Sequence, residues 1–175
     1  MNEQQIEKLK VNRIAEGIVI DKMPPFTSVL ALRLLGLPYD RPQYESDYIT
    51  IPLMNVKSET LGRRKDILKV EGGEDLIRLV SKKDGALALI SEEITVYIIK
   101  DWEKERSYHP KLPDEINGLV NCPHYNCITH KPQEAGSKDK YQTRFNVVSK
   151  NPLSLECTYC KTILGGKEVL ENMIL

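Results

Sequence analysis

The sequence predicts an α+β protein in which a ferredoxin-like domain, the split βαβ arrangement, precedes a small zinc-ribbon-like antiparallel β domain. Three observations lead to this prediction. Residues 11–99 alternate between strand-type and helix-type patterns. All 4 cysteines of the 175-residue chain lie in its last third. The proline-containing stretch 108–113 interrupts these patterns, so we predict domains over 1–111 and 112–175.

The first domain begins with a predicted strand and helix. The strand covers 11–20, where β-branched residues are frequent, and it ends in the proline turn 21–25. Thr27 or Ser28 is expected to cap the helix, and Gly36 is expected to stop it at the C′ position.

Two further strands are predicted over 48–56 and 66–71, separated by a loop over 57–65. Pro52 cannot donate a hydrogen bond to a neighbouring strand, so the first of these is expected at an edge of the sheet.

The rest of the first domain contains one amphipathic segment and two apolar ones. A helix is predicted over 74–83, because its apolar residues fall on one face. The runs 86–90 and 94–99 are interpreted as a final pair of strands that would extend the antiparallel sheet.

The second domain has only short strand candidates, over 143–148 and 153–158, and an exposed loop is expected over 131–140. Such a small domain cannot build a large independent core, so a bound metal would have to supply much of its folding free energy.

The metal ligands predicted from spacing are Cys122, Cys127, Cys157 and Cys160. Each pair can chelate one ion from a tight turn, and two pairs supply the tetrahedral sulfur shell of one structural Zn²⁺ per chain. The alternative is two unrelated reduced pairs in a core. His124 and His130 flank the first pair, but four sulfurs already close the shell, so we expect both outside it.

Composition excludes several classes of partner. The chain has 25 Lys and Arg against 25 Asp and Glu, and residues 114–175 have 7 of each sign, so we expect no nucleic-acid or membrane partner.

No apolar run exceeds the five residues 86–90, which excludes a transmembrane helix. The polar start, 1–5, predicts no secretory signal, and we therefore expect a cytoplasmic location and reduced thiols.

No catalytic motif is found. The sequence has no glycine-rich phosphate loop, no Gly-x-Ser-x-Gly and no His-Glu-x-x-His. A closed four-sulfur site leaves no position for water or substrate, so a structural role is expected for the metal. With no catalytic motif either, the chain is not expected to be an enzyme. The basic run 63–65 could hold phosphate, but it is interpreted as a solvated loop.

Four segments carry a family resemblance. In order they are 17–24, 58–71, 112–130 and 157–160, and together they resemble the regulatory chain of aspartate carbamoyltransferase. The similarity spans roughly residues 9–164. The paired cysteine motifs and the residues around them are its most specific part.

The resemblance implies a regulatory subunit without chemistry of its own. Its N-terminal allosteric domain would form homodimers and bind nucleoside triphosphates, commonly CTP as inhibitor and ATP as activator. Its zinc domain would contact the catalytic chain, which condenses carbamoyl phosphate with aspartate in pyrimidine biosynthesis.

The resemblance also implies seven residues of a nucleotide site. The apolar residues around the base would be Val11, Ile14, Val19 and Ile67. Asp21 and Lys69 would contact the sugar, and Lys22 stands near the phosphates where the family usually has histidine.

Three positions depart from the family pattern. Tyr97 falls where asparagine is usual, Trp102 where tyrosine is usual, and Ser107 where a phosphate-binding lysine is usual. Lys104 and Arg106 lie nearby and are candidates to replace that lysine.

Two other functions stay open on the residues alone. One is a zinc-ribbon module that binds nucleic acid, fused to a ferredoxin-like domain. The other is an enzyme with an unrecognised site in a cleft around Asp21 and Lys69.

Overall fold

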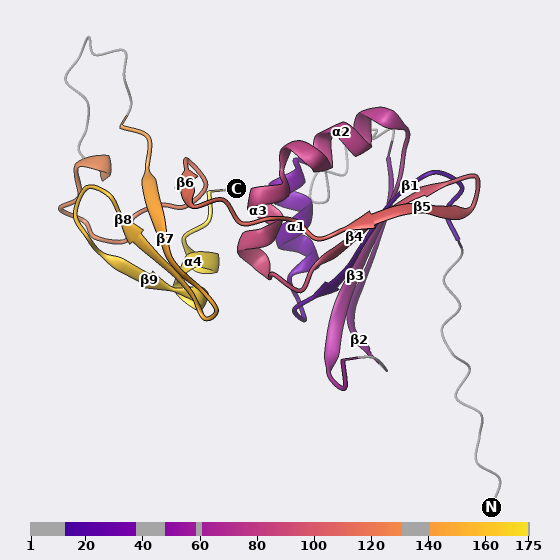
Figure 1. The fold of residues 1–175 in the computed structure, drawn as a ribbon, viewed down its shortest axis with the longest axis horizontal. Helices are drawn as coiled ribbons and strands as arrows, with labels where there is room; N and C mark the ends of the chain where they lie inside the picture. The colour runs from indigo at the N-terminus through magenta and orange to yellow at the C-terminus, as the bar shows by residue number, and fades with distance from the viewer. Residues whose placement is uncertain (1–12, 38–47, 59–60, 131–140, 175) are drawn as a thin grey trace, which may run out of the picture.

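The computed structural model describes residues 13–37, 48–58, 61–130 and 141–174, which form two antiparallel sheets (Figure 1). The elements up to residue 108 are β1 (Gly17–Met23), α1 (Ser28–Leu35), β2 (Ile49–Lys57), β3 (Arg64–Glu71), α2 (Glu74–Lys82), α3 (Asp84–Ile90), β4 (Thr95–Lys100) and β5 (Glu103–Tyr108). The strand order of the first sheet is β2-β3-β1-β4-β5. Four of these strands have the order of the split βαβ arrangement, so the predicted fold class is confirmed.

Alternation along the strands divides the first sheet into two faces. Helices α1 and α2 lie on one face, with α3 packed against both (Figure 1). Ile18, Leu68 and Val96 are fully buried, which places them on this helix-covered face. Val19 and Tyr97 alternate with these residues and are only partly buried. The opposite face, here called the open face, is therefore the one available to a ligand.

Strand β1 begins later and ends later than predicted. Pairing with β3 and β4 starts at Gly17, whose φ is +143° and where a Cβ would lie 2.1 Å from the carbonyl oxygen of Val70. The strand then continues through the expected turn, because Lys22 adopts a φ of 63° and the register with β3 shifts between Ile20 and Met23.

Helix α1 is confirmed, but its predicted cap is wrong. Gly36 has a φ of 70°, and its N–H donates to the carbonyl of Arg33, as expected for a C′ glycine. At the other end, the Thr27 side chain does not cap the helix, and its hydroxyl donates to the carbonyl of Pro24 at 2.7 Å. Instead the carboxylate of Asp66, on β3, accepts the N–H of Ser28 at 3.0 Å. A partner 38 residues away gives no local sequence signal.

The run 86–90 is helical rather than a strand. It belongs to α3, and all five of its residues are buried. A helix buried all round has no polar face, so its period cannot be read from sequence. The strand that extends the sheet is instead β5, which was not predicted because it is highly charged. The predictions of helix α2 and of β2 as an edge strand are confirmed.

The second sheet has the order β6-β7-β8-β9. Its elements are β6 (Glu115–Asn117), the 3₁₀ turn η1 (Ile128–His130), β7 (Arg144–Lys150), β8 (Leu153–Cys157), β9 (Ile163–Gly165) and α4 (Gly166–Glu171). Strands β7 and β8 confirm the two candidates, and the fully buried Phe145 and Leu155 form the centre of its small core. The loop expected over 131–140 lies outside the described residues.

The two halves of the chain meet at α3. This helix contacts α4, and Pro113 of the connecting segment packs on Gly85. The hydroxyl of Tyr108 donates a hydrogen bond of 3.0 Å to Asp84, which fixes the end of β5 beside the start of α3. Across the described ranges, no helix has the length and apolar character needed to cross a membrane.

Candidate functional sites

The four cysteines come together at one point of the second sheet. Their sulfur atoms all lie within 4.8 Å of one another. Cys122 and Cys160 are 3.5 Å apart, and Cys127 and Cys157 are 3.9 Å apart. Four thiolates bound to one zinc ion at about 2.3 Å would be separated by about 3.8 Å. These separations fit a tetrahedral metal site and are far longer than the roughly 2.05 Å of a disulfide.

Two tight turns hold the sulfurs in place. In the first turn, the N–H of Cys127 donates to the carbonyl of His124 at 2.8 Å. In the second, the N–H of Lys161 donates to the carbonyl of Cys157 at 3.0 Å, and Lys161 has a φ of 64°. His130 contacts the carbonyl oxygen of Cys122 through Nε2, so it lies beside the cluster rather than in it.

Electrostatics at this cluster favour a bound cation. Burial raises the pKa of Cys122 and of Cys157. Burial acts in the same direction on Cys160, but its hydrogen bonds with Thr162, Cys122 and Cys157 together outweigh burial and lower its pKa to about 6. Four thiolates this close together repel one another, and a divalent cation removes that repulsion.

A second candidate site is a cavity of about 200 Å³ on the open face of the first sheet. Its lining consists of Arg13, Ile14, Val19, Lys69, Ile99 and Trp102. Three residues of the predicted nucleotide site, Ile14, Val19 and Lys69, therefore lie around one cavity. Arg13 and Ile99 were not predicted, and Arg13 carries no sequence signal beyond its position beside Ile14.

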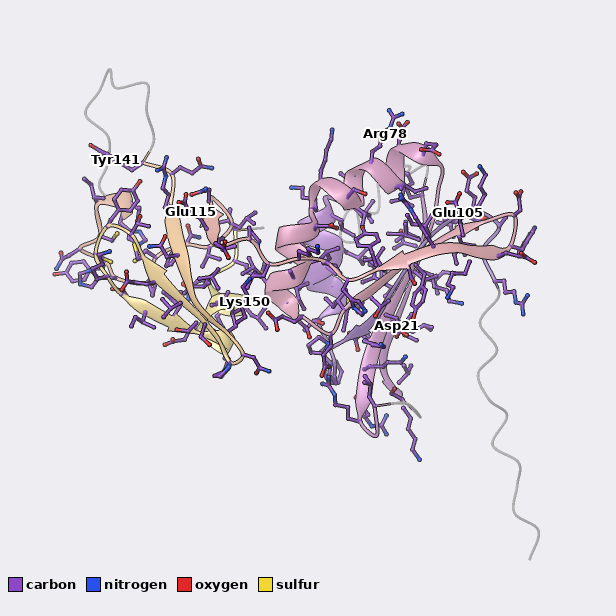
Figure 2. The ribbon with its side chains drawn as sticks, viewed as in Figure 1. Asp21, Arg78, Glu105, Glu115, Tyr141 and Lys150 are labelled. Atoms are coloured by element: carbon purple, nitrogen blue, oxygen red, sulfur yellow. The ribbon has the colours of Figure 1, made fainter. Side chains whose placement is uncertain are left out.

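The other predicted residues do not line this cavity. The carboxylate of Asp21 forms an ion pair with Lys65 at 2.6 Å and accepts the N–H of Lys22 at 2.7 Å. Ile67 is partly buried on β3. Val11 lies outside the described residues. Figure 2 shows Asp21 on the first sheet, well separated from the second sheet, which carries Glu115.

The basic run 63–65 is only partly the solvated loop that the sequence suggested, because only Arg63 lies in an exposed turn before β3 begins. Arg63 forms an ion pair with Glu93. Arg64 donates from Nη1 to the carbonyl of Asn55 at 2.7 Å. Lys65 belongs to β3, and its pair with Asp21 was missed because it joins two strands distant in sequence.

Trp102 is the most unusual member of the cavity. It lies in the turn between β4 and β5 with a φ of 69°, a backbone conformation that residues other than glycine rarely adopt. Its backbone N–H donates to the carbonyl of Ala15 at 3.0 Å, which ties the turn to the segment before β1. The side chain is 58% exposed. The cavity therefore combines an accessible aromatic ring and apolar walls with two cations, which suits a flat ring that carries an anionic group.

Two family models match the chain. The model described as aspartate carbamoyltransferase regulatory chain, allosteric domain, matches residues 9–110. The model described as aspartate carbamoyltransferase regulatory chain, metal binding domain, matches residues 114–170. The first contains the cavity, and the second contains the four cysteines.

Curated proteins named aspartate carbamoyltransferase regulatory chain are similar over nearly the full length. The protein from Ignicoccus hospitalis is 37% identical over 164 residues, covering 94% of this chain and 96% of its own. That from Thermococcus sibiricus is 35% identical over 170 residues, covering 97% and 100%. A protein from Saccharolobus islandicus is 32% identical over 169 residues, covering 96% of each.

Proposed function

We infer that this chain, which belongs to the family of aspartate carbamoyltransferase regulatory chains, is a non-catalytic subunit that transmits nucleotide binding to a catalytic chain. Family membership confirms the resemblance drawn from the residues and favours it over a nucleic-acid-binding module. The observation that carries the proposal is the presence of two separate sites. The cavity with Lys69 lies on the open face of the first sheet, and the four sulfurs lie in the second.

The metal of the second sheet is proposed to be one structural Zn²⁺ per chain, bound by Cys122, Cys127, Cys157 and Cys160. Four sulfur atoms within 4.8 Å of one another can bind one zinc ion tetrahedrally, and such a site leaves no position for a substrate. When bound, the ion would neutralise the thiolates and hold the two turns together. Its role would therefore be to fold this part of the chain.

The effector is proposed to be a nucleoside triphosphate such as ATP or CTP. The base would occupy the cavity between Val19 and Trp102, and Lys69 would contact the sugar. A nucleotide that binds one quaternary state better than another shifts the equilibrium by that difference in affinity, typically about 1–3 kcal/mol.

Two protein partners are proposed, with 1–111 and 112–175 as the functional division. The first part would pair with a second copy of the chain, and the second part would contact the catalytic chain. The second part exposes several large apolar side chains, including Tyr125 at 80% and both Val148 and Ile163 at 59%. Its balanced charge favours a protein partner over nucleic acid.

Co-expression with a catalytic chain of the carbamoyltransferase type tests this function. We expect a stable mixed complex in which carbamoyl transfer responds to ATP or CTP, and no carbamoyl transfer by the isolated chain. A catalytic chain that neither binds this chain nor changes its nucleotide response would contradict the proposal.

A further inference from the structure

We propose that Lys104 binds the phosphates of the effector, and that Arg106 has no part in the site. This inference rests on the proposed function, because it assumes that the cavity on the open face binds a nucleotide. The structure distinguishes two cations that lie two residues apart on the same strand, β5.

The register of the sheet defines which side chains share the open face. Lys69 on β3 pairs with Val19 on β1, Val19 pairs with Tyr97 on β4, and Tyr97 pairs with Ser107 on β5. Directly paired residues lie on the same face of a sheet. Lys69 and Val19 line the cavity, so Tyr97 and Ser107 continue the cavity's face toward β5.

Ser107 has no charge, so this row of residues ends without a cation. The positive charge comes instead from Lys104, whose Nζ lies 5.7 Å from the centre of the Tyr97 ring. An ammonium over an aromatic face at this distance is stabilised by the ring. Tyr97 therefore holds the Lys104 ammonium on the open face, opposite Ser107 and one strand away from Val19.

A bulge in β5 explains why Lys104 reaches this position. Ile98 pairs with Arg106, but the next residue, Ile99, pairs with Lys104. An uninterrupted ladder would set Glu105 opposite Ile99. The extra residue in β5 replaces an acidic residue with a basic one beside Ile99, which itself lines the cavity.

Arg106 lies on the other face. Its partner across the strands, Ile98, is 1% exposed and belongs to the side of the sheet that the helices cover. Its charge lies close enough to Tyr108 to oppose the rise in that residue's pKa, and the Tyr108 hydroxyl is bonded to Asp84 at the start of α3. Arg106 therefore lies on the opposite face of β5 from the cavity.

Three cations thus converge on the open face around one apolar cavity. Arg13 and Lys69 line it, and Lys104 lies beyond Ile99 and Tyr97. Phosphates that extend from a base in the cavity toward β5 would meet Lys104.

Calorimetric titration of the full-length, zinc-loaded chain tests this assignment, with Lys104→Ala compared with Arg106→Ala. The ligands are ATP, CTP, adenosine and cytidine. We expect Lys104→Ala to weaken triphosphate binding by about tenfold or more and to leave nucleoside binding unchanged. We expect Arg106→Ala to change neither. Lys104→Arg should retain most of the triphosphate affinity, and urea unfolding should show that all variants are folded.

The outcomes separate the two proposals. Equal losses for Lys104→Ala and Arg106→Ala, or an equal loss of nucleoside and triphosphate binding in Lys104→Ala, would overturn the assignment and leave nucleotide binding intact. A wild-type chain that binds none of the four ligands at millimolar concentration would overturn both.

Discussion

Asp21 and Lys65 form an ion pair that joins β1 to β3 on the open face, and both side chains are less than one fifth exposed. Asp21 was expected to contact the sugar of a nucleotide. Its carboxylate is already engaged by Lys65 at 2.6 Å, so a ligand must share that carboxylate or displace the lysine. The pair therefore has a structural role that is present before any effector binds.

Removing Lys65 is expected to destabilise the chain. Lys65→Met leaves a largely buried carboxylate without its cation, and the free energy of unfolding should fall by roughly 1–3 kcal/mol in urea titrations. Arg63→Ala is the matched control, because its ion pair with Glu93 is about half exposed and should contribute only about 0–1 kcal/mol. Equal losses of unfolding free energy for the two substitutions would show that the Asp21–Lys65 pair stabilises the chain no more than an exposed ion pair does.

Metal removal should unfold one part of the chain only. A thiol-specific mercurial should eject the zinc ion, and Cys157→Ser should prevent its binding. In both cases proteolysis should then cleave within 114–174 while the first sheet survives. Metal analysis should give one zinc ion per wild-type chain. His124→Ala, at an exposed position beside the cluster, should keep its zinc. A protease-resistant second sheet after complete zinc loss would contradict this prediction.

Asp66 should be essential for the junction between β2, β3 and α1. Its carboxylate is fully buried and accepts N–H groups from Ser28 at 3.0 Å and from Asn55 at 2.7 Å. Asp66→Ala leaves both donors without a partner and should lower the free energy of unfolding by roughly 2–4 kcal/mol. Asp75→Ala, in the exposed first turn of α2, should cost about 0.3–1 kcal/mol. A loss at Asp66 no larger than at Asp75 would refute this.

Stability should fall at high pH because of Tyr108. Burial, followed by the charge of Asp84, raises the pKa of Tyr108 from 10.0 to about 12. A folded-state pKa above the unfolded value gives stability that is complete below pH 10 and is lost as the pH rises toward about 12. The difference in unfolding free energy between wild type and Tyr108→Phe should therefore shift against wild type across this range. A difference that is constant with pH would contradict the prediction.

The features predicted from sequence were those with a local signal. Gly36 marks the end of α1, Pro52 marks an edge strand, and the spacing of the four cysteines indicated their cluster. These signals depend on residue type and short spacing, which folding leaves unchanged.

The features that were missed depend on contacts between distant segments. Helix α3 is buried on every side, so it shows no amphipathic period. Strand β5 follows a two-residue turn in which Asp101 and Trp102 both have positive φ without any glycine. Arg13 lines the cavity, and Lys65 pairs with Asp21, only because folding brings distant segments together. The role of Lys104 required the bulge, which no propensity scale shows.

That bulge also has an evolutionary consequence. The turn fixes Lys100 opposite Glu103, and Val96 is fixed opposite Tyr108, so six residues of β5 span the length of five in β4. The hairpin therefore has one residue more than its ladder requires. Losing the codon for Glu105 would leave both ends and the position of Lys104 in register. An added residue in β4, which is paired on both sides, would shift every contact beyond it. Among related chains, length variation in this hairpin should therefore be found in β5 and not in β4.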